Sequence, residues 1–379
     1  MSNHIRNVLL TPYQLGDLSL RNRIVMAPLT RTRAENAGHV PNDLMVEYYA
    51  QRASAGLIIT EGTWVSEEAQ GWNGVPGIYN EEQGQAWRKV TDAVHARGGK
   101  IFAQLWHQGG VSHHSFYPDG RQPVAPSAIN HEQIVHVRGG SVLSETPRAM
   151  TKDDIKRTVS DFKHASRIAL DAGFDGVQLQ AGYVYLFNQF LHATTNQRTD
   201  DYGGSIENRS RFLFEVLNAV LEVWPSQRIG VKTGPMMNEL GVFKAVDSTL
   251  AVSEYVYEKL GPYNFSHILL MRQMADLTGT PIEELSGDAV VHHFRKRYNG
   301  SLIDLKCRHQ RGTCRTAPWR RCGRLSSLRS GLHRESGSRR ENRRGCPAQS
   351  RTTGKLLRLF RCRIHRLSIP RPGEQLSLG

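Results

Sequence analysis

Short apolar runs recur along the first ~300 residues, and a stretch with helical periodicity follows most of them. None of the runs is longer than seven residues, and most are rich in Ile, Val and Leu, as is typical of strands that are buried on both faces. They occupy residues 24–29, 56–62, 101–106, 176–180, 229–233 and 267–271. We predict a strand at each run and a seventh strand that starts at residues 301–303.

Two of the intervening stretches carry clear helix signals. Residues 81–99 end on Gly98 and Gly99, the usual stop residues of a helix. The stretch 151–173 begins with Thr151, and Asp154 three residues later is typical of a capped start. Strands that alternate with helices imply parallel strands joined by right-handed crossovers. The pattern therefore predicts an α/β protein, and an eight-stranded TIM barrel fits it better than an open sheet.

In such a barrel the chemistry lies at the carboxyl ends of the strands. No glycine-rich GxGxxG follows a strand and no GxxxxGK[ST] occurs, so a Rossmann or P-loop nucleotide site is not expected. The strand ends instead carry neutral hydrogen-bonding groups, aromatic rings and one cation, which suit a flat cofactor with polar edges. These groups are Pro28-Leu29-Thr30, Glu61-Gly62, Gln104-Leu105-Trp106, the segment from Gln180 to Tyr185, and Lys232-Thr233.

The histidines predict no metal site. His113 and His114 are adjacent in the sequence, as are His292 and His293. Neighbouring residues do not share a face at helical spacing, so neither pair has the arrangement that metal ligands need.

Several strings closely resemble the old yellow enzyme family of FMN-dependent oxidoreductases. NRIVMAPLTRTRA (22–34) and YYAQRASAGLIITEGTWVS (48–66) resemble its first two strands, and QPVAPSAI (122–129) resembles a loop. NQRTDDYGGSIENRSRF (196–212) resembles its most recognisable segment, after the fourth strand. The matches follow the family order and cover about residues 8 to 303.

The resemblance implies a two-step reaction on one flavin. NAD(P)H delivers hydride to FMN and leaves, and an electron-poor alkene then takes hydride at its β-carbon and a proton at its α-carbon. Suitable alkenes are enones, enals, maleimides and nitro compounds. The cofactor supplies the redox chemistry, whereas the protein supplies position and electrostatics.

The resemblance also assigns roles to residues of the expected flavin and substrate sites. Thr30 matches a threonine whose hydroxyl bonds the flavin carbonyl next to N5, and Gln104 matches a glutamine at the pyrimidine edge. Tyr185 matches the tyrosine that protonates the α-carbon, and a phenol keeps its proton at neutral pH. Trp106 matches an aromatic wall of the substrate pocket. Backbone positions that line the ring are Pro28, Leu29 and Gly62.

Three departures from the family pattern involve four residues. The family grips the substrate's electron-withdrawing group with HxxN or HxxH, and Gln180 and Tyr183 occupy these places. Both can still donate a hydrogen bond, but neither can become a cation. Lys232 occupies the place of an arginine near flavin N1. The substitution keeps the positive charge but loses the planar guanidinium, which can donate two hydrogen bonds side by side. Gly110 occupies the place of an arginine after LWHxG.

The formal net charge of +14 is concentrated in the last part of the chain. Residues from Asp304 onward contain 20 Lys and Arg and 4 acidic residues, and the remaining 29 basic and 31 acidic residues give a net −2 before that point. All five cysteines lie in the same tail, without any CxxC spacing that would suggest zinc. The tail has no pattern of aromatic residues placed among its basic residues, and it contains no motif of a folded nucleic-acid-binding module. Two compositions therefore meet near residue 304.

A change of reading frame explains the tail better than a functional role does. Residues 306–314, 331–341 and 356–370 can each be encoded by codons that, read in another frame, give strings resembling the family's C-terminal segments, in family order. We hypothesise that the frame changes close to Asp304. Strands seven and eight of the barrel are then missing or disrupted, two strand edges are unpaired, and the loops that bind the FMN phosphate are lost.

The sequence therefore predicts an incomplete FMN-binding TIM barrel over residues 1–303, and a non-native or disordered Arg- and Cys-rich tail over residues 304–379. The expected partners are FMN, NADPH or NADH and a small electron-poor alkene, and the activity of this chain is expected to be impaired. The N-terminus does not resemble a signal peptide and no apolar run is long enough for a membrane helix, so we expect a cytoplasmic protein. The alternative is a vestigial barrel whose basic tail binds nucleic acid or anionic surfaces. The physiological alkene, the choice of NADH or NADPH and the oligomeric state stay open.

Overall fold

The computed structural model describes residues 8–235, 238, 241–272, 276–305 and the backbone of 325–329. The chain divides into two units, Met1–Gly331 and Leu332–Gly379, and every residue of the second unit lies outside the described residues. The predicted tail over 304–379 therefore stays a prediction, apart from its first two residues and the short strand at 325–329.

A closed ring of eight strands forms the centre of the first unit. The ring runs in the order β3-β4-β5-β10-β11-β12-β13-β14 and returns to β3. Its strands are β3 (Ile24–Met26), β4 (Leu57–Trp64), β5 (Ile101–Trp106), β10 (Gly176–Ala181), β11 (Ile229–Thr233), β12 (His267–Met271), β13 (Leu302–Leu305) and β14 (Leu325–Arg329). All six runs that were predicted as strands are confirmed.

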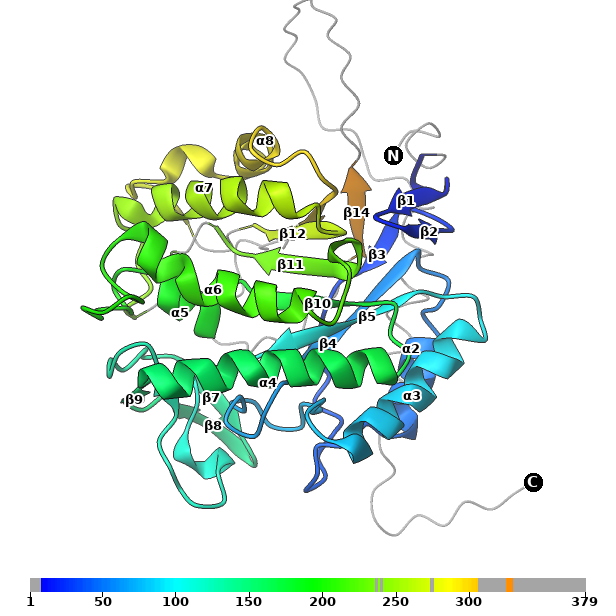
Figure 1. Cartoon of the computed structure of the whole chain (residues 1–379), viewed down its shortest axis with the longest axis horizontal. Helices are drawn as coiled ribbons and strands as arrows, with labels where there is room; N and C mark the ends of the chain where they lie inside the picture. Colours follow the sequence, from blue (N-terminus) through cyan, green and yellow to red (C-terminus); the bar gives the residue numbers. More distant parts are fainter. Residues whose placement is uncertain (1–7, 236–237, 239–240, 273–275, 306–324, 330–379) are drawn as a thin grey trace, which may run out of the picture. The chain divides into compact units, whose positions relative to one another are not determined.

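Helices follow the ring strands, and the longer ones lie on the outside of the barrel (Figure 1). They are α2 (Asp43–Ala50), α3 (Glu81–His95), α4 (Lys152–Asp171), α5 (Leu186–Leu191), α6 (Ile206–Leu221), α7 (Ser248–Leu260) and α8 (Ala289–Arg295). Three two-stranded sheets stand apart from the ring. They pair β1 (Tyr13–Leu15) with β2 (Leu18–Leu20), β6 (Val124–Ala125) with β9 (Arg148–Ala149), and β7 (Ile134–Val137) with β8 (Gly140–Leu143).

Local signals account for the two helices that the sequence predicted most clearly. Thr151 caps α4 through a bond from the Asp154 backbone N–H, and the Asp154 carboxylate accepts from the Thr151 N–H in return. This is the expected capping box, which satisfies two otherwise unpaired donors. After α3 the chain passes through Gly98 with a φ of +69°, a conformation that glycine adopts without a steric penalty.

Seven neighbouring strands of the ring are parallel, and the eighth is not. β3 pairs with β4 in parallel, and so do the successive neighbours up to β13. β14 is antiparallel to both β13 and β3. The fold is thus a TIM barrel whose eighth position is filled by a strand that runs in the opposite direction.

The C-terminal strands confirm part of the sequence prediction and correct another part. β13 is present at the position predicted for strand seven, although it has only four residues. Disruption is confirmed at the eighth position, since a TIM barrel requires eight parallel strands. The prediction of two unpaired edges is wrong, because the backbones of β13 and β3 both pair with β14.

Apolar side chains fill the amino-terminal end of the barrel interior. Leu15, Leu18 and Leu20 from the β1–β2 hairpin pack with inward side chains of the ring, namely Val25, Leu57, Ile59, Phe102, Leu269 and Ile303. All of these are at least 97% buried. Among the described residues, the hairpin therefore covers the amino-terminal end of the barrel interior.

No helix among the described residues is long and apolar enough to cross a membrane.

Candidate active site

The strand register brings four of the predicted site residues into one neighbourhood. Gly62 on β4 pairs with Gln104 on β5. Gln180 on β10 pairs with Lys232 on β11. β5 and β10 are themselves neighbours in the ring. Residues far apart in the sequence thus meet at the carboxyl ends of adjacent parallel strands, where TIM-barrel sites are formed.

Gly62 leaves room that the Trp106 ring uses. A Cβ atom at position 62 would lie 2.1 Å from Cε3 of Trp106, closer than real side chains approach. A bulge separates Ile59 from Gly62 in the pairing of β4 with β5, and bulges of this kind often occur next to active sites. Position 62 therefore requires glycine, because the Trp106 ring fills the space that a side chain there would need.

Four aromatic rings form a continuous row beside this neighbourhood. Trp106 stacks on Trp64 with ring centroids 4.4 Å apart. Tyr185 meets Trp106 edge-on at 4.7 Å, and Tyr183 meets Tyr185 edge-on at 5.6 Å. The structure thus places the predicted proton donor, Tyr185, between the predicted aromatic wall and one of the predicted substrate-binding residues.

Side chains of helix α5 form hydrogen bonds to the backbone of the loop that carries the two tyrosines. Tyr183 has a φ of +60°, which is uncommon for an aromatic residue, and strained backbone of this kind clusters at active sites. The side chain of Asn188 donates to the Tyr183 carbonyl at 2.6 Å, and that of Gln189 donates to the Val184 carbonyl at 2.8 Å. These bonds stabilise the unusual backbone and so fix the direction of both tyrosines.

Pro28, Leu29 and Thr30 follow β3 and are half-buried. The next residue, Arg31, donates its backbone N–H to the carboxylate of Glu61 at 2.9 Å. Glu61 is 1% exposed and precedes Gly62 on β4. The loop with Thr30 is therefore tied to the strand that carries Gly62.

The Glu61 carboxyl is in an unusual electrostatic setting. Burial raises its pKa to about 7, although the Arg31 N–H bond and the Tyr49 hydroxyl favour the charged form. The Tyr49 hydroxyl donates to Glu61 Oε1 at 3.2 Å and accepts the Glu61 backbone N–H at 2.9 Å. The sequence named Glu61 as a strand-end residue but gave it no role.

Gln180 offers hydrogen-bonding capacity that the protein does not use. Its side chain is 5% exposed, and its Oε1 has no hydrogen-bond partner among the described residues. A buried polar atom without a partner costs free energy, on the order of 1–3 kcal/mol. A bound molecule with a suitable donor would recover that cost, so Gln180 is suited to contact a ligand.

Two buried residues of the site were missed by the sequence reasoning. Gln178 on β10 bonds the side chain of Gln104, and His267 on β12 bonds Gln178 in turn. Gln178 and Gln180 lie two positions apart, so both side chains point to the barrel interior. The polar alternation in an otherwise apolar strand was the available signal for Gln178.

Gly110 has a clear structural explanation. A Cβ atom there would lie 2.3 Å from Cε1 and 2.6 Å from Nδ1 of His131. The His131 ring is fully buried and stacks on Phe243 at a centroid distance of 5.4 Å. The imidazole therefore fills the space into which an arginine at position 110 would extend.

One histidine cluster has a composition that metal sites share. Ligand atoms of His113, His114 and Glu145 lie within 4.8 Å of one another. His114 Nδ1 already pairs with Glu145 at 2.9 Å, and the two imidazoles lie 4.0 Å apart at 35°. The expectation of no metal site stays a prediction.

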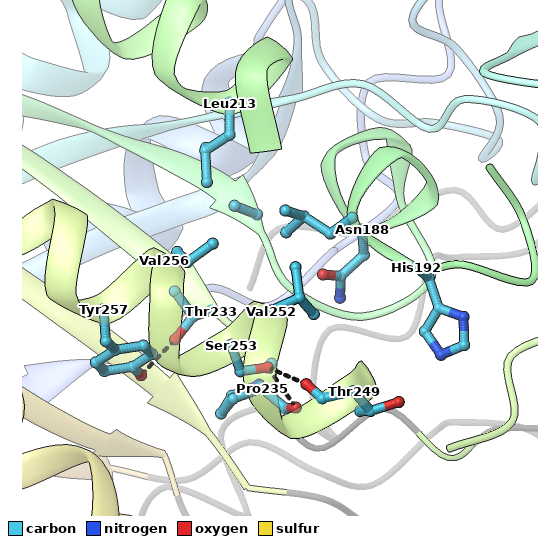
Figure 2. A pocket seen from close by; sticks show the side chains of 13 residues that line it. Asn188, His192, Leu213, Thr233, Pro235, Thr249, Val252, Ser253, Val256 and Tyr257 are labelled. Carbon is cyan, nitrogen blue, oxygen red and sulfur yellow. Dashed lines mark hydrogen bonds between the residues drawn. The ribbon is translucent and has the colours of Figure 1, made fainter. Parts of the chain in front are cut away.

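A separate pocket lies outside the barrel, between β11 and the helices α5, α6 and α7 (Figure 2). Its labelled polar groups largely bond one another: Thr233 with Tyr257, and Ser253 with the carbonyls of Pro235 and Thr249. Its volume of about 30 Å³ fits one or two water molecules. Of the strand-end groups that the sequence singled out, Thr233 lines this pocket, and the pocket is too small for a flavin.

Comparison with known proteins finds relatives that match most of the chain. The family model described as NADH:flavin oxidoreductase / NADH oxidase matches residues 8–297. The chain is 38% identical over 303 residues to 12-oxophytodienoate reductase 1 of Oryza sativa subsp. japonica, covering 78% of this chain and 75% of that protein. It is 47% identical over 231 residues to flavin oxidoreductase hxnT of Emericella nidulans, covering 60% of this chain and 59% of that protein.

Two solved structures are similar over most of the chain. Morphinone reductase in complex with tetrahydroNAD is 42% identical, with a TM-score of 0.70 over 78% of this chain and 79% of its own. The old yellow enzyme homologue from Zymomonas mobilis is 37% identical, with a TM-score of 0.72 over 79% of this chain and 82% of its own.

Proposed function

Because the chain belongs to the NADH:flavin oxidoreductase / NADH oxidase family of FMN enzymes, we propose that it uses FMN and NAD(P)H to reduce the C=C bond of electron-poor alkenes. The observation that carries the proposal is the register that sets Gly62 beside Gln104 and Gln180 beside Lys232, next to the aromatic row. The names of the relatives, which include 12-oxophytodienoate reductase and morphinone reductase, support a reductase.

The residues present fit a flavin ring. Gln104 is 2% exposed and uses one side-chain N–H for Gln178, so its other N–H and its Oε1 remain for the polar edge of a ring. Gly62 lets the Trp106 ring pack directly against β4, beside the place where the flavin ring would lie. When bound, FMN supplies the hydride-transfer chemistry.

Two further residues would adjust the flavin site. The Thr30 hydroxyl would donate a hydrogen bond to the ring, and the loop that carries it is tied to Glu61 through Arg31. Lys232, 7% exposed, would bring positive charge to the ring and so favour negative charge there. A lysine does this as a point charge, without the paired hydrogen bonds of an arginine.

The substrate side depends on three residues of one loop and strand. Gln180 and Tyr183 would bind the electron-withdrawing group of the alkene through an amide and a hydroxyl. Tyr185 would hold a proton on its hydroxyl oxygen and deliver it to the α-carbon. Its edge-on contact with Trp106, at 4.7 Å, would keep the phenol in one orientation.

We also propose that this chain binds FMN less tightly than an intact barrel would. In TIM barrels the phosphate is commonly bound by the loops after strands seven and eight and by a helix N-terminus. The antiparallel β14 puts its carboxyl end at the opposite end of the barrel from that of β13. The loop after the eighth strand therefore does not start where the phosphate would lie.

The test compares two flavins and then offers a substrate. Binding of FMN and of riboflavin is measured by quenching of flavin fluorescence. We expect the two dissociation constants to agree within about threefold, because the phosphate of FMN adds little binding free energy in this chain. With saturating riboflavin and NADPH under anaerobic conditions, 2-cyclohexenone and β-nitrostyrene are then added and the saturated products are quantified. Flavin binding without reduction of any alkene in such a panel would contradict the proposed reaction.

A further inference from the structure

A row of buried polar side chains crosses the barrel interior beneath the predicted flavin site. Gln104 Nε2 donates to Gln178 Oε1 at 2.7 Å, and Gln178 Nε2 lies 2.8 Å from His267 Nε2. The three side chains come from β5, β10 and β12, and they are 2%, 0% and 0% exposed. Buried polar groups of this kind are retained at a cost, so the row calls for a physical explanation.

All hydrogen bonds of the row are donated in the same direction along it. A carboxamide nitrogen only donates, so His267 Nε2 accepts a hydrogen bond from the Gln178 amide and the imidazole is neutral. Burial lowers the pKa of His267 to about 3, which agrees with a neutral ring. Nδ1 then carries the proton and donates to Ser266 Oγ at 3.0 Å, and that hydroxyl donates to the Ile229 carbonyl at 2.8 Å. Each group thus donates to the next, starting from Gln104.

A glycine on the intervening strand makes the row possible. β11 lies between β10 and β12, and its Gly230 pairs with both Gln178 and His267. A Cβ atom at position 230 would lie 2.3 Å from Cε1 of the imidazole. Because this side chain is absent, His267 can reach across β11 to Gln178. Gln104 pairs with Gln178 on the other side, so all four residues occupy one level of the barrel.

We propose that Gln178 and His267 are positioning residues that fix the side-chain amide of Gln104 for the pyrimidine edge of the flavin. The inference rests on the proposed function, since it assigns Gln104 to the flavin. With one N–H committed to Gln178, the amide has one orientation and presents Oε1 together with its second N–H. The pyrimidine edge of a flavin has the complementary pattern, an N3–H donor beside carbonyl acceptors.

The test uses riboflavin and its N3-methyl derivative as probes, because neither has a phosphate and only one has the N3–H donor. Both dissociation constants are measured by fluorescence quenching for the wild-type chain and for His267→Phe, which keeps an aromatic ring and removes the acceptor. We expect the wild type to prefer riboflavin by about tenfold, the worth of one or two neutral hydrogen bonds. In the variant we expect the preference to fall to about twofold or less.

Further variants separate positioning from general stability. Gln178→Leu breaks the row at its centre and should lower the preference in the same way, which keeps the test decisive if His267→Phe does not fold. His267→Gln supplies a new acceptor and should restore part of the preference. The control is Thr91→Val on α3, at a residue that is also fully buried and bonds the Ala172 carbonyl outside the row. It should lower Tm and leave the preference unchanged.

The outcomes distinguish the inference from the proposed function. A tenfold preference that persists in both His267→Phe and Gln178→Leu would overturn the positioning role while leaving flavin recognition intact. Failure of the wild-type chain to bind riboflavin would overturn the proposed function and the inference together.

Discussion

Replacing Glu61 by glutamine should change how the stability of the protein depends on pH. The carboxyl is 1% exposed, and burial raises its pKa from 4.5 to about 7. A folded-state pKa above the unfolded value means that folding favours the protonated form. The stabilisation that comes from protonated Glu61 is fully present below pH 4.5, decreases as the pH rises through 7, and is constant at higher pH.

The magnitude follows from the size of the shift. A shift of about 2.5 pKa units corresponds to about 3 kcal/mol between the two ends of that pH window. Glu61→Gln stays neutral throughout, so it does not lose this contribution. The variant has a constant cost, because one of the two donors from Arg31 and Tyr49 now faces an amide N–H.

The assay is urea unfolding of both proteins at intervals from pH 4.5 to 8.5. We expect the free energy of unfolding of Glu61→Gln to rise relative to the wild type by about 3 kcal/mol across this range. Glu47→Gln, at an exposed glutamate on the neighbouring helix α2, is the matched control and should give a constant difference. Parallel curves for Glu61→Gln and the wild type would refute the reasoning.

Three further substitutions test the site. Gly62→Ala should displace the Trp106 ring, because the new Cβ would lie 2.1 Å from it. We expect a loss of about 1–3 kcal/mol in the free energy of unfolding, together with weaker riboflavin binding. An unchanged free energy of unfolding and unchanged riboflavin binding would count against the packing of Trp106 on Gly62. Tyr185→Phe should slow alkene reduction by about 100-fold and leave the rate of flavin reduction by NADPH unchanged, as stopped-flow absorbance would measure; equal rates of alkene reduction would remove its role as proton donor. Gly110→Arg should destabilise the protein because the His131 ring fills that space, and the double change with His131→Ala should recover part of the lost Tm, whereas additive effects would contradict the shared space.

The barrel was predictable because its strands are short, apolar and separated by helices. The run IFAQLW, for example, became β5 with all of its residues buried. The sequence also placed Gln104 and Gly62 at strand ends, and the parallel register then makes them neighbours. Local chemistry was sufficient for the α4 cap, since Thr151 and Asp154 lie within one turn.

What the sequence did not predict depends on contacts between distant strands. His267 bonds Gln178 across β11 only because Gly230 has no side chain, and no local pattern reveals that coincidence. The antiparallel direction of β14 is seen only in its pairing with β13 and β3, two strands that are distant in the sequence from each other. The left-handed backbone of Tyr183 depends on Asn188, five residues later in a different element.

The central claim is that residues at the carboxyl ends of the parallel strands bind a flavin in a form that NAD(P)H can reduce. The most direct measurement is the visible spectrum of the purified protein with added FMN, followed by anaerobic addition of NADPH. The account predicts a protein-bound flavin spectrum with a shifted 400–500 nm band (roughly the range of any flavin), and bleaching of that band by NADPH. An FMN spectrum identical to that of the free cofactor, unchanged by NADPH over the same time, would contradict it.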